Sequence, residues 1–170
     1  NADSVTLVRG DVVYIFGAAG NRASVKLASN VGDTTSSKTF GIIQDTIAPN
    51  NTGTMVTVGV IDGLNLAGYT DGDILWLDSV AGDFTKTKPT APNHTVFLGV
   101  VERANAGNGQ IYVKVQNGYE LGELHNVLTN GAGEGNVLTY DSNTALWTHR
   151  PPTRSLSFSD SAAETVDRVL

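Results

Sequence analysis

Apolar residues along this chain come in short runs separated by polar turns rich in Gly, Asn and Asp. Residues 12–16 are almost continuously apolar, which predicts a strand buried on both faces. Residues 23–28 alternate between apolar and polar side chains, which predicts a strand with one face in solvent. Asn108-Gly109 is a dipeptide typical of tight hairpins and precedes a further apolar run. The remaining runs predict strands at residues 4–8, 40–43, 55–61, 74–77, 84–86, 96–102 and 111–116.

The pattern occurs twice. Residues 10–15 (GDVVYI) match 72–77 (GDILWL), residues 40–43 (FGII) match 98–101 (LGVV), and residues 56–58 (VTV) match 113–115 (VKV). The offsets are 72 − 10 = 62, 98 − 40 = 58 and 113 − 56 = 57, so the strands repeat while the loops change length. Such self-similarity predicts a duplicated β module whose two copies share a core.

We therefore expect an all-β fold, a duplicated antiparallel β-barrel or sandwich, over residues 1–118. Its copies span about residues 10–61 and 72–116. Residues 119–170 do not continue the repeated strand pattern. They are expected to form a C-terminal connector, a β-hairpin around the turn 142–145, and a short helix.

The helix is predicted from a capping box, Ser161 to Glu164, in which each side chain satisfies a free backbone N–H. Four apolar residues then share one helical face. We expect them to form either an oligomer contact or a cap on the domain: Ala162, Val166, Val169 and Leu170.

The composition of the chain argues against several classes of partner and of chemistry. The formal net charge is −6 without any run of Lys or Arg, which argues against nucleic acid. No apolar segment approaches the roughly 20 residues that a membrane helix needs, so we expect no membrane insertion. The absence of cysteine removes disulfides and thiolate sites. The chain begins with Asn1, as a processed protein or a fragment would.

We predict neither catalytic residues nor a metal or other cofactor. The glycine-containing loop at 17–22 lacks the Gly-Lys-Ser/Thr ending of a phosphate-binding loop and is expected to be a hairpin turn. His94, His125 and His149 have no carboxylate or serine at a telling spacing, although a triad needs only proximity in space. Several aspartates have the oxygen chemistry for calcium but not the spacing of an EF-hand, and turn formation is the favoured role: Asp62, Asp71, Asp73, Asp78 and Asp83. Within the repeat, Asp11 and Asp73 should accept hydrogen bonds from local backbone N–H groups.

Exposed aromatic rings can stack on sugars. Tyr14 and Trp76 occupy equivalent positions in apolar strands and are expected in the core. Trp147 and Tyr140 are the candidate glycan-binding residues. They can also pack against each other as a cross-strand pair.

Parts of the chain resemble virion structural proteins of tailed bacteriophages. The similarity lies in residues 99–103 (GVVER) with 109–113 (GQIYV), in 118–127 (GYELGELHNV), and in 135–141 (GNVLTYD) with 146–147 (LW). These segments resemble tail-fibre and related appendage proteins of phages from aquatic bacteria, including cyanobacteria. The similarity extends over roughly residues 10–150 and supplies no catalytic residue.

The resemblance implies a non-enzymatic structural subunit of a virion appendage, a homotrimeric adaptor or spacer that contacts other virion proteins. Its location would be the extracellular particle, after assembly in the host cytoplasm. Two alternatives stay open: a module that binds host surface polysaccharide, and a capsid decoration protein.

Overall fold

The computed structural model describes residues 1–152. The four residues predicted to form an oligomer contact, Ala162, Val166, Val169 and Leu170, lie outside this range, as does the predicted helix. The chain divides into two units, Asn1–Gly118 and Tyr119–Leu170. Strands form nearly all the regular structure of the described residues, so the predicted all-β class is confirmed.

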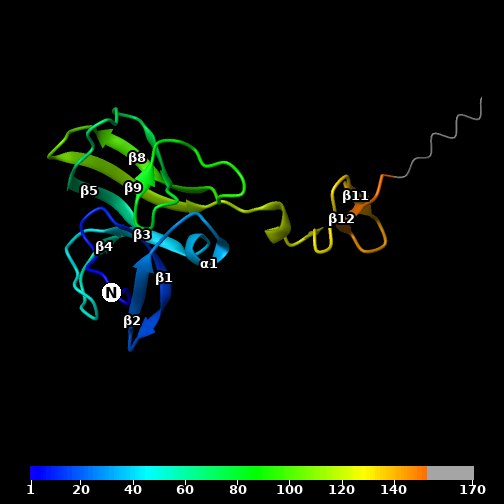
Figure 1. Ribbon diagram of the computed structural model, residues 1–170, viewed down its shortest axis with the longest axis horizontal. Coiled ribbons are helices and arrows are strands. Elements are labelled where there is room, and N and C mark those ends of the chain that lie inside the picture. The colour runs from blue at the N-terminus through cyan, green and yellow to red at the C-terminus, as the bar shows by residue number, and fades with distance from the viewer. Residues whose placement is uncertain (153–170) are drawn as a thin grey trace, which may run out of the picture. The chain divides into compact units, whose positions relative to one another are not determined.

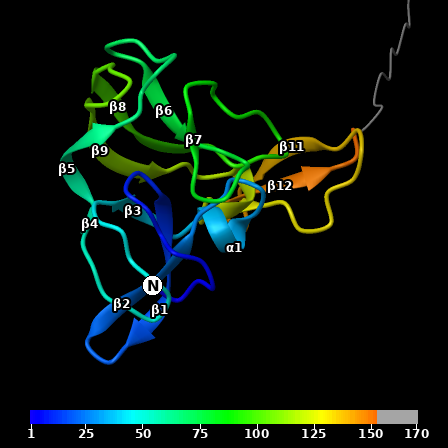
Figure 2. The same cartoon turned by 60° about the vertical axis from the view of Figure 1, so that its left-hand side comes forward.

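The first unit contains two antiparallel sheets, which form separate layers in Figures 1 and 2 (blue to cyan, and green). The first sheet has the order β2-β1-β3-β4. Its strands are β1 (Val12–Ala19), β2 (Arg22–Leu27), β3 (Thr39–Ile43) and β4 (Met55–Val56). A single helical turn, α1 (Asp33–Ser36), lies between β2 and β3.

The second sheet has the order β5-β9-β8-β6-β7. Its strands are β5 (Val58–Leu64), β6 (Ile74–Leu77), β7 (Phe84–Thr85), β8 (Val96–Arg103) and β9 (Gly109–Asn117). The hairpin predicted from Asn108-Gly109 is confirmed, since β8 pairs with β9 antiparallel.

Two strand predictions need correction. Residues 4–8 form no strand, and only Leu7 makes a bridge, to Ile47. The single strand predicted at 55–61 is divided at Thr57, because its first part pairs with β3 and its second part with β9. This segment therefore passes from one sheet to the other.

The duplication is visible in the topology. The first sheet, β2-β1-β3-β4, has the same order as the β7-β6-β8-β9 part of the second. The N–H of Gly10 donates to the carbonyl of Ile43 (2.9 Å), and that of Gly72 donates to the carbonyl of Val101 (2.8 Å). Both glycines have positive φ, +100° and +89°, which other residues adopt at a cost.

The two aspartates that follow these glycines have the predicted role. The carboxylate of Asp11 accepts a hydrogen bond from the N–H of Val8 (2.7 Å). The carboxylate of Asp73 accepts one from the N–H of Thr70 (2.9 Å). Each side chain thus closes the turn that leads into the first strand of its copy.

The last strand of the repeat is one residue out of the predicted register. Ile42 pairs with Val56, and its counterpart Val100 pairs with Tyr112. Val56 therefore corresponds to Tyr112, at an offset of 112 − 56 = 56, and not to Val113. A slip of one residue moves a side chain to the opposite face of the sheet, so this correction decides which residues are exposed.

We call the two faces of each copy its front and its back. The front of the first sheet carries Val12, Tyr14, Ile42 and Val56, and the back of the second sheet carries Leu75, Val101 and Ile111. These surfaces meet in one core. The back of the first sheet carries Val13, Val25, Ile43 and Met55, and Leu7 and Ile47 cover it. Both faces of β1 are therefore buried over residues 12–14, as the continuous apolarity predicted, but Phe16, at the end of the same apolar run, is 57% exposed.

Two asparagines also join the sheets. The side-chain amide of Asn30 donates to the carbonyl of Leu77 (2.8 Å), and the backbone carbonyl of Asn30 accepts from the N–H of His94 (2.8 Å). From the other direction, the amide of Asn117 donates to the carbonyl of Ser37 (2.9 Å). Buried polar groups are stable only with such partners, so these bonds help to fix how the sheets pack.

The second unit contains a small sheet of order β10-β12-β11. Its strands are β10 (Val127–Leu128), β11 (Val137–Asp141) and β12 (Leu146–Arg150). The predicted hairpin around residues 142–145 is confirmed by the antiparallel pairing of β11 with β12. A third strand, β10, was not predicted and pairs with β12 in parallel.

Gly99→Ala should destabilise the protein strongly. A Cβ at position 99 would lie 2.1 Å from the carbonyl oxygen of Tyr112, on a backbone with φ of +157°. We expect the free energy of unfolding to fall by roughly 3 kcal/mol, as for an overpacked core, in urea titrations followed by circular dichroism. Gly107→Ala is the matched control: nothing lies within 4 Å of its added Cβ, so a change within about 0.5 kcal/mol is expected. Equal effects of the two substitutions would contradict this account.

Replacing the carboxylate by a neutral side chain should have opposite effects on the stability of the fold at Asp11 and at Asp73. Burial raises the pKa of Asp11, against the hydrogen bond from Val8, and Asp83 raises it further. Its carboxyl therefore contributes stability below its unfolded pKa that is lost as the pH rises through the folded value. Hydrogen bonds from the backbone and then the side chain of Thr70 lower the pKa of Asp73, with Lys86 assisting. Its contribution is present above the unfolded pKa and is lost as the pH falls through the folded value.

At pH 7 we expect Asp73→Asn to lower the melting temperature. This deficit should shrink as the pH falls through the lowered pKa of Asp73, because the wild-type carboxylate is then progressively neutralised as well. Asp11→Asn, which keeps a side-chain acceptor for Val8, should leave the pH 7 melting temperature unchanged or raise it. Scanning calorimetry from pH 7 to pH 3 measures both, and a larger pH 7 loss in Asp11→Asn would refute the assignment.

Candidate interaction surfaces

The front of the second sheet is apolar and uncovered. By the repeat, Ile74 corresponds to Val12 and Val100 to Ile42. Val12 and Ile42 are fully buried, whereas Ile74 is 46% exposed and Val100 is partly exposed. The same module face is thus the centre of a core in the first copy and a surface in the second.

Strand register makes this surface continuous. Val60 on β5 pairs with Tyr112 on β9, which pairs with Val100 on β8, which pairs with Ile74 on β6. The four side chains form a row across four neighbouring strands. We use "open face" for this row together with Val58, Trp76 and Phe97.

Trp76 belongs to this surface, so its predicted place in the core is wrong. Its ring meets Phe97 edge-on, with centroids 5.9 Å apart, and the ammonium of Lys88 lies 5.4 Å from its centroid. Tyr14, its counterpart in the first copy, is 7% exposed and lies in the core as predicted. The two residues differ because only the first sheet has another sheet on its front.

Polar residues share this side of the sheet with the open face. Lys114 pairs with Val58, Gln116 pairs with Phe97, and Lys88 lies over Trp76. Protein–protein interfaces commonly combine apolar side chains with polar and charged ones in this way.

In the second unit, Tyr140 and Trp147 face each other across the hairpin as a cross-strand pair. Their ring centroids are 5.5 Å apart at an interplanar angle of 59°. The rings remain 55% and 40% exposed. The geometry leaves both rings accessible to a ligand.

The second unit lacks a core of its own within the described residues. No side chain between residues 119 and 152 is buried. Eight large apolar side chains in this stretch are 40% exposed or more: Tyr119, Leu121, Leu124, Leu128, Val137, Leu138, Tyr140 and Trp147. A three-stranded sheet this small has little stability without an apolar surface to pack against.

The polar residues considered for chemistry have structural partners. His149 lies within hydrogen-bond distance of the Asn136 side chain (3.0 Å) and the Asn130 carbonyl (2.9 Å). His94 lies 3.3 Å from a carboxylate oxygen of Asp33, and His125 is exposed on the second unit.

The aspartates considered for calcium are engaged in turns and surface pairs. Asp71 accepts from the N–H of Ala104, and Asp78 accepts from the N–H of Ser79. Asp62 pairs with Arg9. Residues 1–152 contain no group of three potential metal ligands.

No family model, curated protein or solved structure matches the chain. No helix within residues 1–152 has the length and apolar character needed to cross a bilayer. A proposal for the function must therefore start from the open face and from the exposed aromatic pair of the second unit.

Proposed function

We propose that this chain is a non-enzymatic structural subunit of a bacteriophage virion appendage, a tail fibre or fibre-like protein, in which it serves as a homotrimeric adaptor or spacer. The open face of the second sheet is the observation that carries the proposal. Its apolar row is continuous over four strands, whereas the counterparts of Ile74 and Val100 in the first copy, Val12 and Ile42, are fully buried.

The repeat itself supports an occupant made of β-structure. In the first copy, the front face packs against a second sheet through Val12, Tyr14 and Ile42. The open face carries residues of similar size at the same positions, namely Ile74, Trp76 and Val100. Contiguous apolar patches of this kind on soluble proteins usually mark interaction sites.

Copies of the same chain are the proposed partners because the second unit also needs one. Residues 119–152 expose eight large apolar side chains and bury none. Such a segment requires a partner whenever the protein is folded, and identical chains provide one in fixed proportion. Cyclic symmetry then brings the same surfaces together about one axis, and a trimer is the arrangement that the resemblance to phage fibres implies.

The resemblance to phage appendage proteins, which extends over roughly residues 10–150, supports the virion setting. Other virion proteins would then bind at the ends of the subunit. The particle would carry the protein outside the cell after its assembly in the host cytoplasm. A capsid decoration protein would use the same self-association, with shells instead of appendages as its attachment site.

Binding of host glycan is a second candidate function, favoured by Tyr140 and Trp147. Two exposed rings at 59° form a shallow aromatic surface on which a sugar ring can pack.

Tyr112→Lys should disrupt self-association. Tyr112 lies in the middle of the open face and is 40% exposed, so the chain should fold with the substitution, while a buried ammonium in the interface would be costly. We expect a trimer for the wild type in multi-angle light scattering. For the variant, dissociation should move to a concentration at least roughly tenfold higher, since central interface aromatics typically contribute 2 kcal/mol or more.

Val31→Lys is the matched control, because Val31 is 65% exposed and lies on the loop before α1. It should remain a trimer, and circular dichroism should be the same for all three proteins. A wild type that stays monomeric at every concentration would refute the proposal. Equal dissociation of the two variants would remove the open face as its cause.

Trp147→Ala tests the second function. If the aromatic pair binds sugar, saturable binding to host surface polysaccharide should fall by roughly tenfold, the effect of losing about 1 to 2 kcal/mol of stacking and buried area. Surface plasmon resonance on immobilised polysaccharide measures it, with Tyr119→Ala, another exposed aromatic of the second unit, as control. Binding that is equal in the wild type and Trp147→Ala would exclude this role for the pair.

A further inference from the structure

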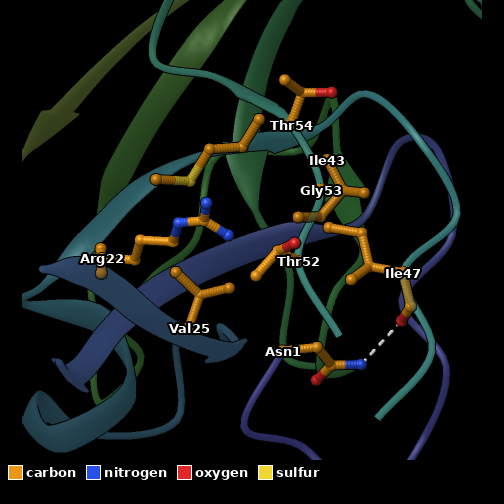
Figure 3. Close-up of a pocket in the computed structure, with 10 residues that line it drawn as sticks. Asn1, Arg22, Val25, Ile43, Ile47, Thr52, Gly53 and Thr54 are labelled. Atoms are coloured by element: carbon orange, nitrogen blue, oxygen red, sulfur yellow. Dashed lines mark hydrogen bonds between the residues drawn. The ribbon is translucent and has the colours of Figure 1, made fainter. Parts of the chain in front are cut away.

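A hollow lies on the back of the first sheet, where Leu7 and Ile47 cover the sheet only in part. Its volume is about 260 Å³. Its floor is aliphatic, formed by Val25, Ile43, Ile47 and Met55. Thr52 and Thr54 supply hydroxyl groups at its border. Figure 3 shows this lining, with the side chain of Arg22, the first residue of β2, extending into the hollow.

A second hollow of about 190 Å³ adjoins the first. The two share Asn1, Arg22, Ala23 and Thr52. The second hollow is lined by alanines together with polar residues, among them Ser24, Asn50 and Asn51. Together they form one site with an aliphatic part and a part rich in amides and hydroxyls.

Arg22 lines both hollows, and its guanidinium has no partner among residues 1–152. Of the four arginines in residues 1–152, Arg9 pairs with Asp62, Arg103 donates to the carbonyl of Asn108, and Arg150 pairs with Asp141. The guanidinium of Arg22 makes no hydrogen bond or ion pair within these residues, although the backbone of Arg22 pairs with that of Ala19. Neither hollow is lined by Asp or Glu, so an anion would meet an unopposed guanidinium.

The walls of the site are well fixed. The amide of Asn1 donates to the carbonyl of Ile47 (2.7 Å), and the N–H of Asn50 donates to the carbonyl of Asn1 (3.0 Å). These bonds hold the loop 47–52 against the N-terminal segment. The side-chain amides of Asn50 and Asn51 have no hydrogen bond within residues 1–152, so they are available to a ligand.

We propose that this site binds an acidic sugar residue that carries a small acyl group. The carboxylate would form a bidentate pair with Arg22, the geometry for which guanidinium is suited. The hydroxyl groups of the sugar would bond to the amides of Asn50 and Asn51, and the acyl methyl would enter the aliphatic hollow. That hollow has the volume of about nine waters at roughly 30 Å³ each, enough for an acetamido group and one edge of a sugar ring.

The site shares no residue with the open face or with the pair Tyr140 and Trp147, so it does not depend on the proposed function. Free short-chain carboxylates share the anionic and aliphatic chemistry of the ligand. They lack the hydroxyl groups that Asn50 and Asn51 would bind, so binding experiments can distinguish a short-chain carboxylate from an acidic sugar.

The experiment is isothermal titration calorimetry of the full chain with N-acetylneuraminic acid, which has a carboxylate, an acetamido group and several hydroxyls. Glucuronic acid lacks the acyl group, N-acetylglucosamine lacks the carboxylate, and butyrate lacks the hydroxyls. We expect saturable binding of N-acetylneuraminic acid and at least roughly tenfold weaker binding of the other three, since each loses one set of contacts.

Arg22→Gln should weaken binding of N-acetylneuraminic acid by roughly tenfold or more, because hydrogen bonds between charged groups are about twice as strong as neutral ones. Ala23→Phe, which places a ring at the border of both hollows, should weaken it as well. Arg103→Gln is the matched control and should bind like the wild type, because Arg103 lies in neither hollow.

Absence of saturable binding would overturn the proposal, and so would an unchanged affinity in Arg22→Gln. Equal affinity for butyrate would overturn the assignment to a sugar. Normal circular dichroism of each variant is required for these comparisons, and it is expected because Arg22 and Ala23 are exposed.

Discussion

The packing of the front of one sheet against the back of the next is the constraint on which the rest of this structure depends. Val12, Tyr14 and Ile42 on the first sheet meet Leu75 and Ile111 on the second, and this contact provides the main core. When two modules of the same topology pack front to back, one front face and one back face are always left without a partner sheet. A symmetric sandwich, in which like faces meet, differs in this respect. The chain covers the unpaired back with Leu7 and Ile47 and leaves the unpaired front open.

This asymmetry gives residues with the same origin different environments. Val12 is fully buried, while its counterpart Ile74 is 46% exposed. The hydrogen bonds from Val8 and Thr70 are equivalent, yet burial raises the pKa of Asp11 whereas the hydrogen bonds dominate at Asp73 and lower it. Local structure follows the repeated sequence in both copies, and burial follows the position of each copy in the stack.

The sequence predicted the features that depend on neighbouring residues. Strand positions, the β8–β9 hairpin at Asn108-Gly109 and the turn role of Asp73 all follow from alternation and turn chemistry. Features that depend on distant segments were missed. The run at 74–77 is as apolar as that at 12–16, so no local signal placed Trp76 at the surface. Its exposure could have been predicted only from the repeat together with knowledge of which sheet has its front packed against the other. The hollow beside Arg22 was beyond prediction because its walls come from three separate parts of the chain.

The same stack separates the two proposed surfaces. The open face lies on the outer side of the second sheet, and the hollow beside Arg22 lies behind the first sheet, so the thickness of both sheets stands between them. Subunits that associate through their open faces would therefore keep their hollows turned towards solvent. Each hollow alone is small and would bind weakly, but three held in one assembly would bind a repeating polysaccharide with an effective concentration set by their spacing. Self-association in this fold would thus increase the strength of attachment without any change in the individual site.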